Sequence, residues 1–310
     1  RLIALGGKSM SAVLTSTPTL AVEPLPQRRV GKTGERVPVL GLGTGPGGLG
    51  LPDSEAIPLY EAAIDHGITY LDTAPGYNRA HVQLGQILPS RRSQVFLATK
   101  ACAPTAAEVL SIHEQSLKDL RVDSVDLLYA HGIGSFDPEQ LLAPDGAFAG
   151  LLEARRRGWT RYIGFTAHHH PWKAERLLRE ALKGNLELDA VMLAMNFVDR
   201  HTYGFEELVL PLARQLDLGV AVMKVYGGAQ EMKYEEYRNS QLKAGHHAAF
   251  RYALGLPGAS LAVVGMYSIA EVERNVAWAR NWEPLTGEEE ERLQAEGRAL
   301  AAEWGPHFGE

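Results

Sequence analysis

The sequence predicts an α/β fold: a (β/α)8 TIM barrel with an N-terminal β-hairpin and an extra C-terminal helix. Short, apolar, β-branched runs alternate along the chain with longer segments of helical periodicity. There are eight such runs, and they are apolar on both faces, as strands are when helices cover a parallel sheet. No linker or shift in composition divides the repeats, so one closed barrel accounts for them better than an open sheet does.

The first predicted element is a hairpin. Between Arg29 and Leu42, two short runs with alternating apolar residues flank the turn signal at residues 32–35 (KTGE). Residues 1–27 lack periodicity, are punctuated by Ser, Thr, Pro and Gly, and begin with Arg rather than Met. We therefore assign residues 1–27 to a disordered tail, a cloning remnant or the trimmed end of an export signal, three alternatives that stay open. Residues 28–310 are assigned to a single barrel domain.

The repeats of the barrel follow from the apolar runs and from the periodic segments between them. The eight predicted strands are Val37–Gly43, Ile68–Thr73, Val95–Lys100, Val125–His131, Tyr162–Thr166, Ala190–Asn196, Val220–Val225 and Leu261–Gly265. The predicted helices are Glu55–Asp65, Val82–Leu88, Ala106–Leu120, Glu139–Arg157, Trp172–Lys183, Phe205–Leu216, Tyr237–Leu254 and Ile269–Arg280. The charged stretch from Glu283 to Glu303 is expected to form the extra C-terminal helix.

Composition and charge exclude several classes of protein. Hydrophobic residues make up 45% of the 310 residues and charged residues 22%, which suits a large buried core. The net charge of -6 argues against nucleic acid or an anionic membrane as the main partner, and no run of about 18 apolar residues could span a bilayer. The single cysteine, Cys102, cannot form an internal disulfide, and no Cys/His pattern indicates a metal site. We expect a cytoplasmic protein unless the tail is an export signal; the sequence does not indicate its oligomeric state.

A glycine-rich loop follows the first barrel strand. Residues 43–48 (GTGPGG) match the GxGxxG pattern, and Asp72 ends an apolar strand further on, as in a Rossmann fingerprint. That fingerprint requires a helix directly after the glycines, because the helix N-terminus holds a pyrophosphate. Here we expect the next helix to begin only near Asp53, a suitable N-cap. We therefore do not assign a Rossmann fold.

Chemically reactive side chains gather at the ends of the predicted strands, where barrel enzymes carry their active sites. Asp72 lies at the end of the second strand, Lys100 ends the third and His131 ends the fourth. Tyr77 lies in the loop that follows Asp72. Each has a structural alternative when taken alone: a capping Asp, a solvated Lys, a core His or a Tyr that covers the barrel mouth. Burying the acid, the amine and the imidazole together is costly unless they pair, so we predict one shared pocket.

A run of three histidines, His168 to His170, follows the fifth strand. Adjacent side chains point in different directions, and no carboxylate or thiol accompanies them, so we predict no metal site. His168 and His169 are candidates for contacts with a polar substrate or cofactor. Their alternative is a solvated loop.

Several motifs in order along the chain resemble those of aldo-keto reductases. They are ITYLDTAPGYN at 68–78, VFLATK at 95–100, SLKDLRVDSVDLLYAHG at 116–132, RYIGFTAH at 161–168, MNFVDRH at 195–201, GVAVMK at 219–224 and VVGMYSIAEVERN at 263–275. The resemblance runs from about Arg29 to the helix after the last strand. It implies an NAD(P)-dependent oxidoreductase that interconverts an aldehyde or ketone, sugars included, and its alcohol. A cofactor-holding regulatory or sensing barrel with little turnover is the alternative.

The resemblance implies a catalytic tetrad of Asp72, Tyr77, Lys100 and His131. Tyr77 would exchange a proton with the carbonyl oxygen, although a free phenol has a pKa of about 10. A nearby Lys100 ammonium favours the phenolate and lowers that pKa towards neutrality, while Asp72 holds the ammonium in place. His131 would donate a hydrogen bond that orients the substrate carbonyl.

The resemblance also implies a nicotinamide cofactor, NADP(H) or NAD(H), that lies extended across the barrel mouth. The residues expected to bind it are Gly43, Thr44, Thr166, Asn196, Met223, Lys224, Gly227, Gly265, Met266, Ser268, Glu271 and Asn275. The segment Gly265–Asn275 would hold the adenosine end, with a phosphate near a helix N-terminus. The chain departs from the family pattern near the nicotinamide: Ala167 and Met192 replace an Asn and a Gln, and Met223 replaces an aromatic ring.

Glu271 bears on the choice of cofactor. Aligned backwards from Asn275, it occupies the position at which relatives place Arg or a neutral group against the 2′-phosphate of NADP. A carboxylate repels that phosphate but can accept hydrogen bonds from the ribose hydroxyls of NAD. Arg274, about one helical turn further on, could supply a compensating charge. We expect a weakened preference for NADP(H), with NAD(H) usable or favoured.

Overall fold

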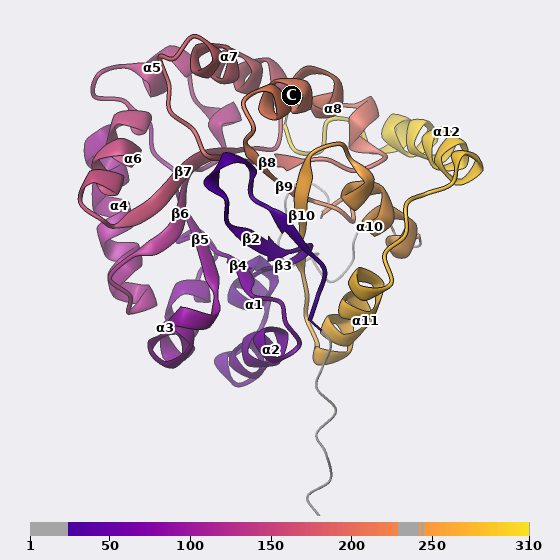
Figure 1. Cartoon of the computed structure of the whole chain (residues 1–310), viewed down its shortest axis with the longest axis horizontal. Coiled ribbons are helices and arrows are strands. Elements are labelled where there is room, and N and C mark those ends of the chain that lie inside the picture. Colours follow the sequence, from indigo (N-terminus) through magenta and orange to yellow (C-terminus); the bar gives the residue numbers. More distant parts are fainter. Residues whose placement is uncertain (1–23, 229–241, 243–244, 310) are drawn as a thin grey trace, which may run out of the picture.

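The computed structural model describes residues 24–309 except 229–241 and 243–244. Within this part of the chain, eight parallel strands close into a barrel in the order β10-β3-β4-β5-β6-β7-β8-β9, and helices surround it (Figure 1). The predicted fold class is confirmed, together with the N-terminal hairpin and the C-terminal helix. The predictions for residues 1–23, and for 237–241 and 243–244 of one helix, lie outside the described residues.

The barrel strands lie within a few residues of the predicted ranges. They are β3 (Leu40–Gly43), β4 (Tyr70–Asp72), β5 (Phe96–Ala101), β6 (Val125–Ala130), β7 (Thr160–Ala167), β8 (Ala190–Ala194), β9 (Gly219–Met223) and β10 (Ala259–Gly265). The sheet closes where Leu40 of β3 pairs with Ala262 of β10. Because all neighbours are parallel, the carboxyl ends of the strands meet at one mouth of the barrel.

The helices are α1 (Gly45–Gly50), α2 (Asp53–Asp65), α3 (Ala80–Arg91), α4 (Ala106–Leu120), α5 (Pro138–Leu142), α6 (Ala147–Arg156), α7 (Pro171–Leu182), α8 (Phe205–Leu208), α9 (Leu210–Gln215), α10 (His246–Gly255), α11 (Ile269–Arg280) and α12 (Gly287–Trp304). The bounds of α4 and α11 are the predicted ones. Side-chain caps fix their starts, because Thr105 accepts from the Glu108 amide and Ser268 from the Glu271 amide.

Two predicted helices are each divided in the structure. The helix predicted over Glu139–Arg157 is interrupted by Pro144 and Gly146, and Gly146 is the extended N-cap of α6. The helix predicted over Phe205–Leu216 divides at Val209, because Pro211 near the start of α9 has no amide to continue the hydrogen bonding of α8.

A short helix, α1, occupies the glycine-rich loop, so the expectation that no helix precedes Asp53 is wrong. Pro46 in its first turn is compatible with a helix start. A side chain on Gly47 would place its Cβ 2.2 Å from the Tyr60 hydroxyl, and one on Gly48 would lie 2.1 Å from the carbonyl of Tyr77. The glycines therefore allow close packing of α1 against its neighbours.

The start of α2 also differs from the prediction. Pro52 is its N-cap, and Asp53 is the first helical residue rather than the cap. The Asp53 carboxylate instead accepts a hydrogen bond from the Arg79 side chain at 2.8 Å. This contact joins the start of α2 to the segment just before α3.

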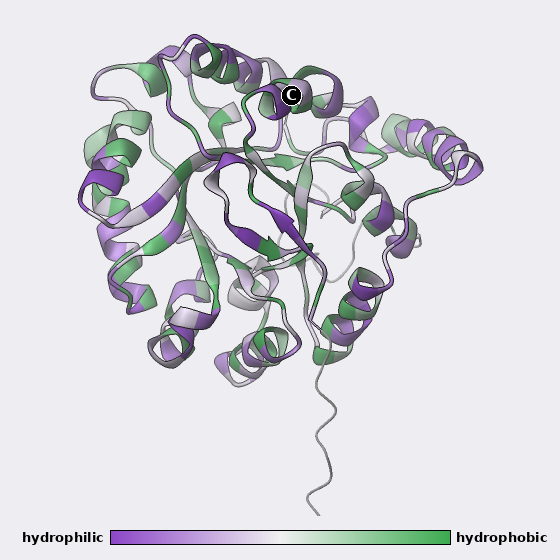
Figure 2. Ribbon diagram, in the orientation of Figure 1, coloured by the Kyte–Doolittle hydropathy of each residue, from purple (hydrophilic) through white to green (hydrophobic). Residues whose placement is uncertain are grey.

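The hairpin covers the amino ends of the barrel strands. Its strands β1 (Gln27–Arg29) and β2 (Arg36–Pro38) are antiparallel, and the Ser260 hydroxyl at the start of β10 donates to the carbonyl of Arg29. The hairpin crosses the middle of the barrel in the view of Figure 1. Figure 2 shows hydrophilic residues along it. Leu25, just before it, is buried, so the packed chain reaches back at least to this residue. The carboxyl ends of the strands open on the opposite side.

The C-terminal segment returns to those carboxyl ends. A capping box at Thr286 starts α12, and the chain after the helix brings His307 within 2.7 Å of the buried Asp199 carboxylate. The Phe308 amide donates to the Tyr203 hydroxyl at 2.7 Å. Both partners lie in the segment that follows β8. Among the described helices, none is long and apolar enough to cross a membrane.

Candidate active site

A buried ion pair between β4 and β5 forms the centre of the site. Asp72 pairs in register with Ala98, and Lys100 lies two residues further along β5 on the same face. The Lys100 Nζ lies 2.6 Å from Asp72 Oδ2, and the two residues are 1% and 3% exposed. Burial lowers the pKa of Lys100 and raises the pKa of Asp72, while their mutual attraction opposes both shifts.

The hydrogen bonds of Lys100 favour the charged form of the pair. Its Nζ donates to the Asp72 carboxylate, to the carbonyl of Thr73 at 2.9 Å and to the Tyr77 hydroxyl at 3.3 Å. An ammonium has three N–H donors, and the three oxygens use them all. The phenol of Tyr77 therefore lies directly beside a positive charge.

Tyr77 is held by the elements on either side of its loop. Its amide donates to the carbonyl of Ala74 at 3.0 Å, and the amide of Ala80 donates to its carbonyl at the start of α3. A Cβ on Gly45 of α1 would lie 3.9 Å from the phenol ring. The turn, α1 and α3 together fix the position of the phenol.

His131 lies beside the phenol, directly after β6. Its ring is perpendicular to that of Tyr77, with 6.3 Å between the centroids. Burial, followed by the charges of Lys100 and Lys224, lowers the pKa of His131 to about 3. The imidazole is therefore neutral near pH 7, with one nitrogen that can donate a hydrogen bond and one that can accept. The structure thus brings together the four residues predicted as a tetrad.

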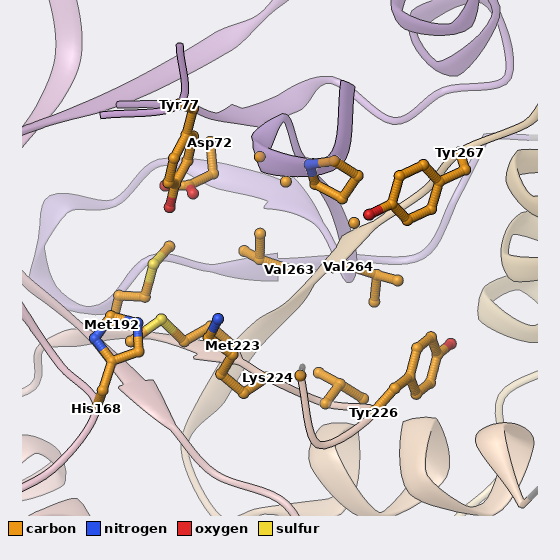
Figure 3. A pocket seen from close by; sticks show the side chains of 16 residues that line it. Asp72, Tyr77, His168, Met192, Met223, Lys224, Tyr226, Val263, Val264 and Tyr267 are labelled. Carbon is orange, nitrogen blue, oxygen red and sulfur yellow. The ribbon is translucent and has the colours of Figure 1, made fainter. Parts of the chain in front are cut away.

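A cavity opens beside the tetrad at the carboxyl ends of the strands. Asp72 and Tyr77 lie at one end of it, and Tyr226 and Tyr267 lie at the other (Figure 3). The lining residues are Gly43, Gly45, Pro46, Asp72, Tyr77, His168, Met192, Met223, Lys224, Val225, Tyr226, Gly228, Val263, Val264, Gly265 and Tyr267. Among the predicted cofactor residues, Gly43, Met223, Lys224 and Gly265 line this cavity.

Three other predicted cofactor residues direct their polar groups into the protein. Thr44 donates to the carbonyl of Asp72 at 3.0 Å, and Thr166 accepts from the amide of Gly132 at 2.8 Å. Asn196 accepts from two backbone amides and donates to the Asp199 carboxylate and to the carbonyl of Lys224. These hydrogen bonds shape the loops of the barrel mouth.

The segment predicted to hold adenosine surrounds the start of α11. Met266 is buried, and Ser268 is the N-cap of the helix. The Glu271 carboxylate accepts a hydrogen bond from the Tyr267 amide, with 2.7 Å between nitrogen and oxygen. This contact places a negative charge at the helix N-terminus. Asn275 lies one turn further along the helix, and its Oδ1 accepts a hydrogen bond from the Tyr226 hydroxyl at 2.7 Å.

Gly227, the remaining predicted cofactor residue, does not line the cavity. It has a φ of 80°, in the left-handed region that favours glycine. A Cβ there would lie 2.6 Å from the ring of Trp304, at the end of α12. Its role in the structure is to let α12 approach the loop after β9.

The two candidate substrate residues differ in position. His168 lines the cavity, and its ring lies 6.3 Å from that of His131 and 6.1 Å from that of Phe308. Burial, followed by the charge of Lys224, lowers the pKa of His168 well below its usual range. His169 instead contacts His170 through the Nδ1 atoms and is not part of the lining. In the described residues, no three potential metal-ligating side chains converge.

Sequence reasoning missed Tyr226, Tyr267 and Phe308. The first two lie three and two residues after the ends of β9 and β10, so the strand-end rule that found the tetrad could have found them. Phe308 had no comparable signal. It lies after α12, far along the chain from any barrel strand, and reaches His168 only through the fold.

The wall of the cavity includes much backbone and apolar surface. The cavity runs from Tyr77 to the loops beside α11, and four of its lining residues are glycines: Gly43, Gly45, Gly228 and Gly265. A Cβ on Gly265 would lie 2.5 Å from Pro46, so even a methyl group would disturb this wall. Met192 and Met223 supply apolar surface at the end near His168.

The chain is similar to several known proteins. The profile of the Aldo/keto reductase family matches residues 39–248. Pyridoxal 4-dehydrogenase from Microbacterium luteolum is 27% identical, over 81% of this chain and 92% of its own. L-galactose dehydrogenase from Arabidopsis thaliana is 25% identical, over 87% and 92%. An aldo/keto reductase from Klebsiella pneumoniae, solved with NADP and acetate, shares the fold with a TM-score of 0.69 at 22% identity, over 91% and 97%. The chain therefore belongs to the aldo/keto reductase family and is an oxidoreductase of that family.

Proposed function

We propose that this chain is an NAD(P)-dependent oxidoreductase that interconverts a small aldehyde or ketone, sugars included, and the matching alcohol. The hydrogen bond from the Lys100 ammonium to the Tyr77 hydroxyl, at 3.3 Å, carries the proposal. It places a proton donor, with a cation beside it, at one end of a cavity that extends to Tyr226 and Tyr267. The named relatives act on a pyridoxal and on a sugar, which supports small carbonyl and alcohol substrates.

The tetrad moves a proton at the substrate oxygen. In reduction, the Tyr77 phenol gives its proton to the carbonyl oxygen, and the Lys100 ammonium stabilises the phenolate left behind. Asp72 keeps the ammonium charged and in place. The neutral His131 donates a hydrogen bond to the same oxygen and orients the carbonyl. A nicotinamide cofactor, when bound, supplies or accepts the hydride; in oxidation, the phenolate takes the proton from the alcohol.

The side of the cavity near His168 includes two methionines. Met192 and Met223 replace the Gln and the aromatic ring of the family pattern, and both line the cavity. Ala167, which replaces the Asn of that pattern, does not line it. His168 lies beside the two methionines, and Lys224 follows Met223 in the lining (Figure 3). We assign His168 the contact with the nicotinamide amide or with a polar substrate. Its neutral form can donate or accept.

Glu271 supports a weakened preference for NADP(H), with NAD(H) usable or favoured. Its carboxylate accepts the amide of Tyr267 and so lies fixed at the N-terminus of α11. A helix N-terminus attracts a phosphate, but a carboxylate already there offsets that attraction and repels a dianion. A ribose with free hydroxyls meets no such repulsion and can donate to the carboxylate.

Replacing Tyr77 by Phe tests the proposed function. We expect kcat to fall on the order of 10²-fold or more, because the variant lacks the proton donor. The dissociation constants of NAD and NADP should stay the same, since the ring remains. The measurements are a titration of each cofactor and turnover of an aldehyde and sugar panel. Near-normal turnover in the variant would refute the tetrad, and cofactor binding without turnover in the wild type would favour the regulatory barrel.

Replacing Glu271 by Arg tests the choice of cofactor. The wild type should bind NAD at least comparably to NADP, and the variant should shift towards NADP because a repelling charge becomes an attracting one. Dissociation constants for both cofactors in both proteins measure this shift. A wild type that prefers NADP by about 100-fold, or a variant that does not shift, contradicts the assignment.

A further inference from the structure

A second cavity lies in the outer ring of helices, at the side of the barrel where α8, α10 and α12 lie (Figure 1). Its volume of about 550 Å³ is that of a small-molecule site. One wall is formed by α8 and α9, and the other by α10, the loop after it and the start of α12 with the segment before it. The lining residues are Arg200, Glu206, Glu207, Leu210, Pro211, Arg214, Arg251, Tyr252, Gly255, Leu256, Pro257, Pro284, Leu285 and Glu290. Among the described residues, this cavity and the one beside the tetrad share none.

A buried carboxylate in the second cavity has an oxygen without a partner. The Glu206 side chain is 7% exposed, and its Oε2 accepts a hydrogen bond from the Tyr252 hydroxyl at 2.5 Å. Arg200 Nη1 lies 3.5 Å from the same oxygen. Within the described residues, the buried Oε1 has no hydrogen-bond partner. A buried acceptor is costly unless a donor meets it, so this oxygen is a place for an N–H group of a ligand.

The same wall carries a second charged group, Arg214. This residue is exposed, and in the part of the chain that the structure describes its guanidinium makes no ion pair or hydrogen bond. Glu206, Leu210 and Arg214 follow one another at intervals of four residues along α8 and α9, which places them on one face. The backbones of Glu206 and Arg214 are therefore about 12 Å apart along the helical direction. Leu210 lies between the two charges.

The rest of the lining supports a ligand with an apolar middle. Six leucines and prolines from both walls contribute to it, namely Leu210, Pro211, Leu256, Pro257, Pro284 and Leu285. Two other arginines of the lining are already paired, because Arg251 binds Glu289 at 2.7 Å and Arg200 binds Glu207 at 2.5 Å. Glu206 Oε1 and the Arg214 guanidinium are thus left to recognise a ligand.

We propose that this cavity binds a small zwitterion whose ammonium meets Glu206, whose carboxylate meets Arg214, and whose apolar chain lies between them. An ammonium has N–H donors for Oε1, and a guanidinium matches the two oxygens of a carboxylate. The leucines and prolines remove the methylene groups from water. An ω-amino acid has this chemistry. The inference goes beyond the proposed function and does not depend on it, because the second cavity takes no part in the redox reaction.

The titration of Glu206 gives this binding a signature. Burial raises the pKa of Glu206 to about 7. Of the groups around it, Tyr252 and Arg200 lower the pKa, whereas the charges of Glu207 and Glu290 raise it. A bound ammonium favours the carboxylate, so binding near pH 7 should release protons from the molecules in which Glu206 is protonated. The affinity should therefore fall as the pH is lowered from about 8 to about 6.

Calorimetric titration with ε-aminocaproate tests the inference, with caproate and hexylamine as compounds that each lack one charge. The wild type should bind ε-aminocaproate saturably, and each of the other two compounds about 10-fold more weakly or worse. Titrations near pH 7 in two buffers that differ in ionisation enthalpy should show the release of protons.

Glu206→Gln keeps the size of the side chain and removes its charge. This variant should bind ε-aminocaproate about 10-fold more weakly or worse and release no protons, while caproate binds as in the wild type. Glu207→Gln is the matched control, since it changes the next carboxylate along the chain, which is exposed and already paired with Arg200. Its affinity should stay within about 3-fold of the wild type, and it should still release protons.

Arg214→Leu tests the other charge. Its affinity for ε-aminocaproate should fall to that of hexylamine, while hexylamine itself should bind as in the wild type. Because Arg214 is exposed, this variant decides the question if Glu206→Gln does not fold, as judged by circular dichroism.

Three results would overturn the inference. They are a wild type that does not bind ε-aminocaproate saturably, a wild type that binds all three compounds equally, and binding that releases no protons near pH 7 or is unchanged in both variants. None of these measurements uses turnover, so the proposed oxidoreductase activity stands or falls separately with Tyr77→Phe.

Discussion

Lys100 and Asp72 each need the opposite charge of the other, because both side chains are almost completely buried. The pair serves the Tyr77 phenol, yet it is also part of the stability of the barrel. Removing one partner leaves the other charge buried and uncompensated, whereas removing both leaves none. Activity and stability should therefore respond differently to single and double substitutions.

For Lys100→Met we expect loss of activity and a fall of about 3–5 kcal/mol in the free energy of unfolding. The double variant Asp72→Asn/Lys100→Met should recover most of that stability, since no lone charge remains, but none of the activity. Urea unfolding and turnover at saturating cofactor measure the two effects. A single variant that keeps its turnover would show that the ammonium does not serve the phenol.

The same residues show what a sequence can predict about a site. Asp72 and Lys100 were predictable because a strand end fixes both the position and the direction of a side chain. Thr166 and Asn196 occupy equally good positions, but their polar groups bond to the protein itself. Residue type and position cannot distinguish a donor that faces a backbone carbonyl from one that faces a ligand. Only the packed structure decides.

At the scale of elements, α1 links the first barrel strand to the catalytic loop. Gly48 of this helix lies so close to the loop that a Cβ would come within 2.1 Å of the Tyr77 carbonyl and 2.6 Å of Ala80. Neither contact can be relieved by rotating a side chain. A methyl group at this position must therefore move either α1 or the loop.

We predict that Gly48→Ala lowers kcat on the order of 10²-fold, because a displacement of about 1 Å at a catalytic group can have that effect. Gly76→Ala is the matched control: it lies one residue before Tyr77, and a Cβ there would meet no atom within 4 Å. Its kcat should stay near the wild-type value. Steady-state kinetics and thermal melting of both variants measure the difference. Equal kcat values in the two variants would contradict the role of α1.

The elements also differ in how well a sequence pattern predicts them. The strands were predictable because buried β-branched runs between periodic helices have few other interpretations. The helix α1 was not, since glycine has a low helix propensity and this helix packs closely against Tyr60 and Tyr77. Likewise, the apolar periodicity of Glu139–Arg157 continues through Pro144, although the backbone does not continue as one helix.

At the scale of the whole molecule, several histidines are kept neutral by the fold. Burial is the largest cause in each case: it lowers the pKa of His81 to about 3 and that of His113 to about 4, as it does for His131. They lie on different elements around the barrel. In the unfolded chain, their pKa values return to about 6.5.

We predict that acid begins to destabilise the protein at about pH 6.5, above the range in which unperturbed carboxylates titrate. Below about pH 6.5 these histidines bind protons in the unfolded chain but stay neutral in the folded chain. The stability present at neutral pH is therefore lost as the pH falls towards 4. Each such histidine contributes a slope of about 1.4 kcal/mol per pH unit. Urea unfolding at several pH values measures the slope. His113→Gln can still donate a hydrogen bond to the carbonyl of Trp159. This variant should lower the slope by the contribution of one histidine, about 1.4 kcal/mol per pH unit.

The pairing of β3 with β10 has a consequence for how the molecule forms. Each strand and its following helix can associate with neighbours along the chain, but the partners Leu40 and Ala262 come from opposite ends of the barrel sequence. Closing so long a loop is a slow, entropically costly step. Both α1, which supports Tyr77, and Tyr267 follow the two strands of this seam. A molecule still open along the seam would keep most of its helices and lack the cavity, so catalytic competence should appear last in folding.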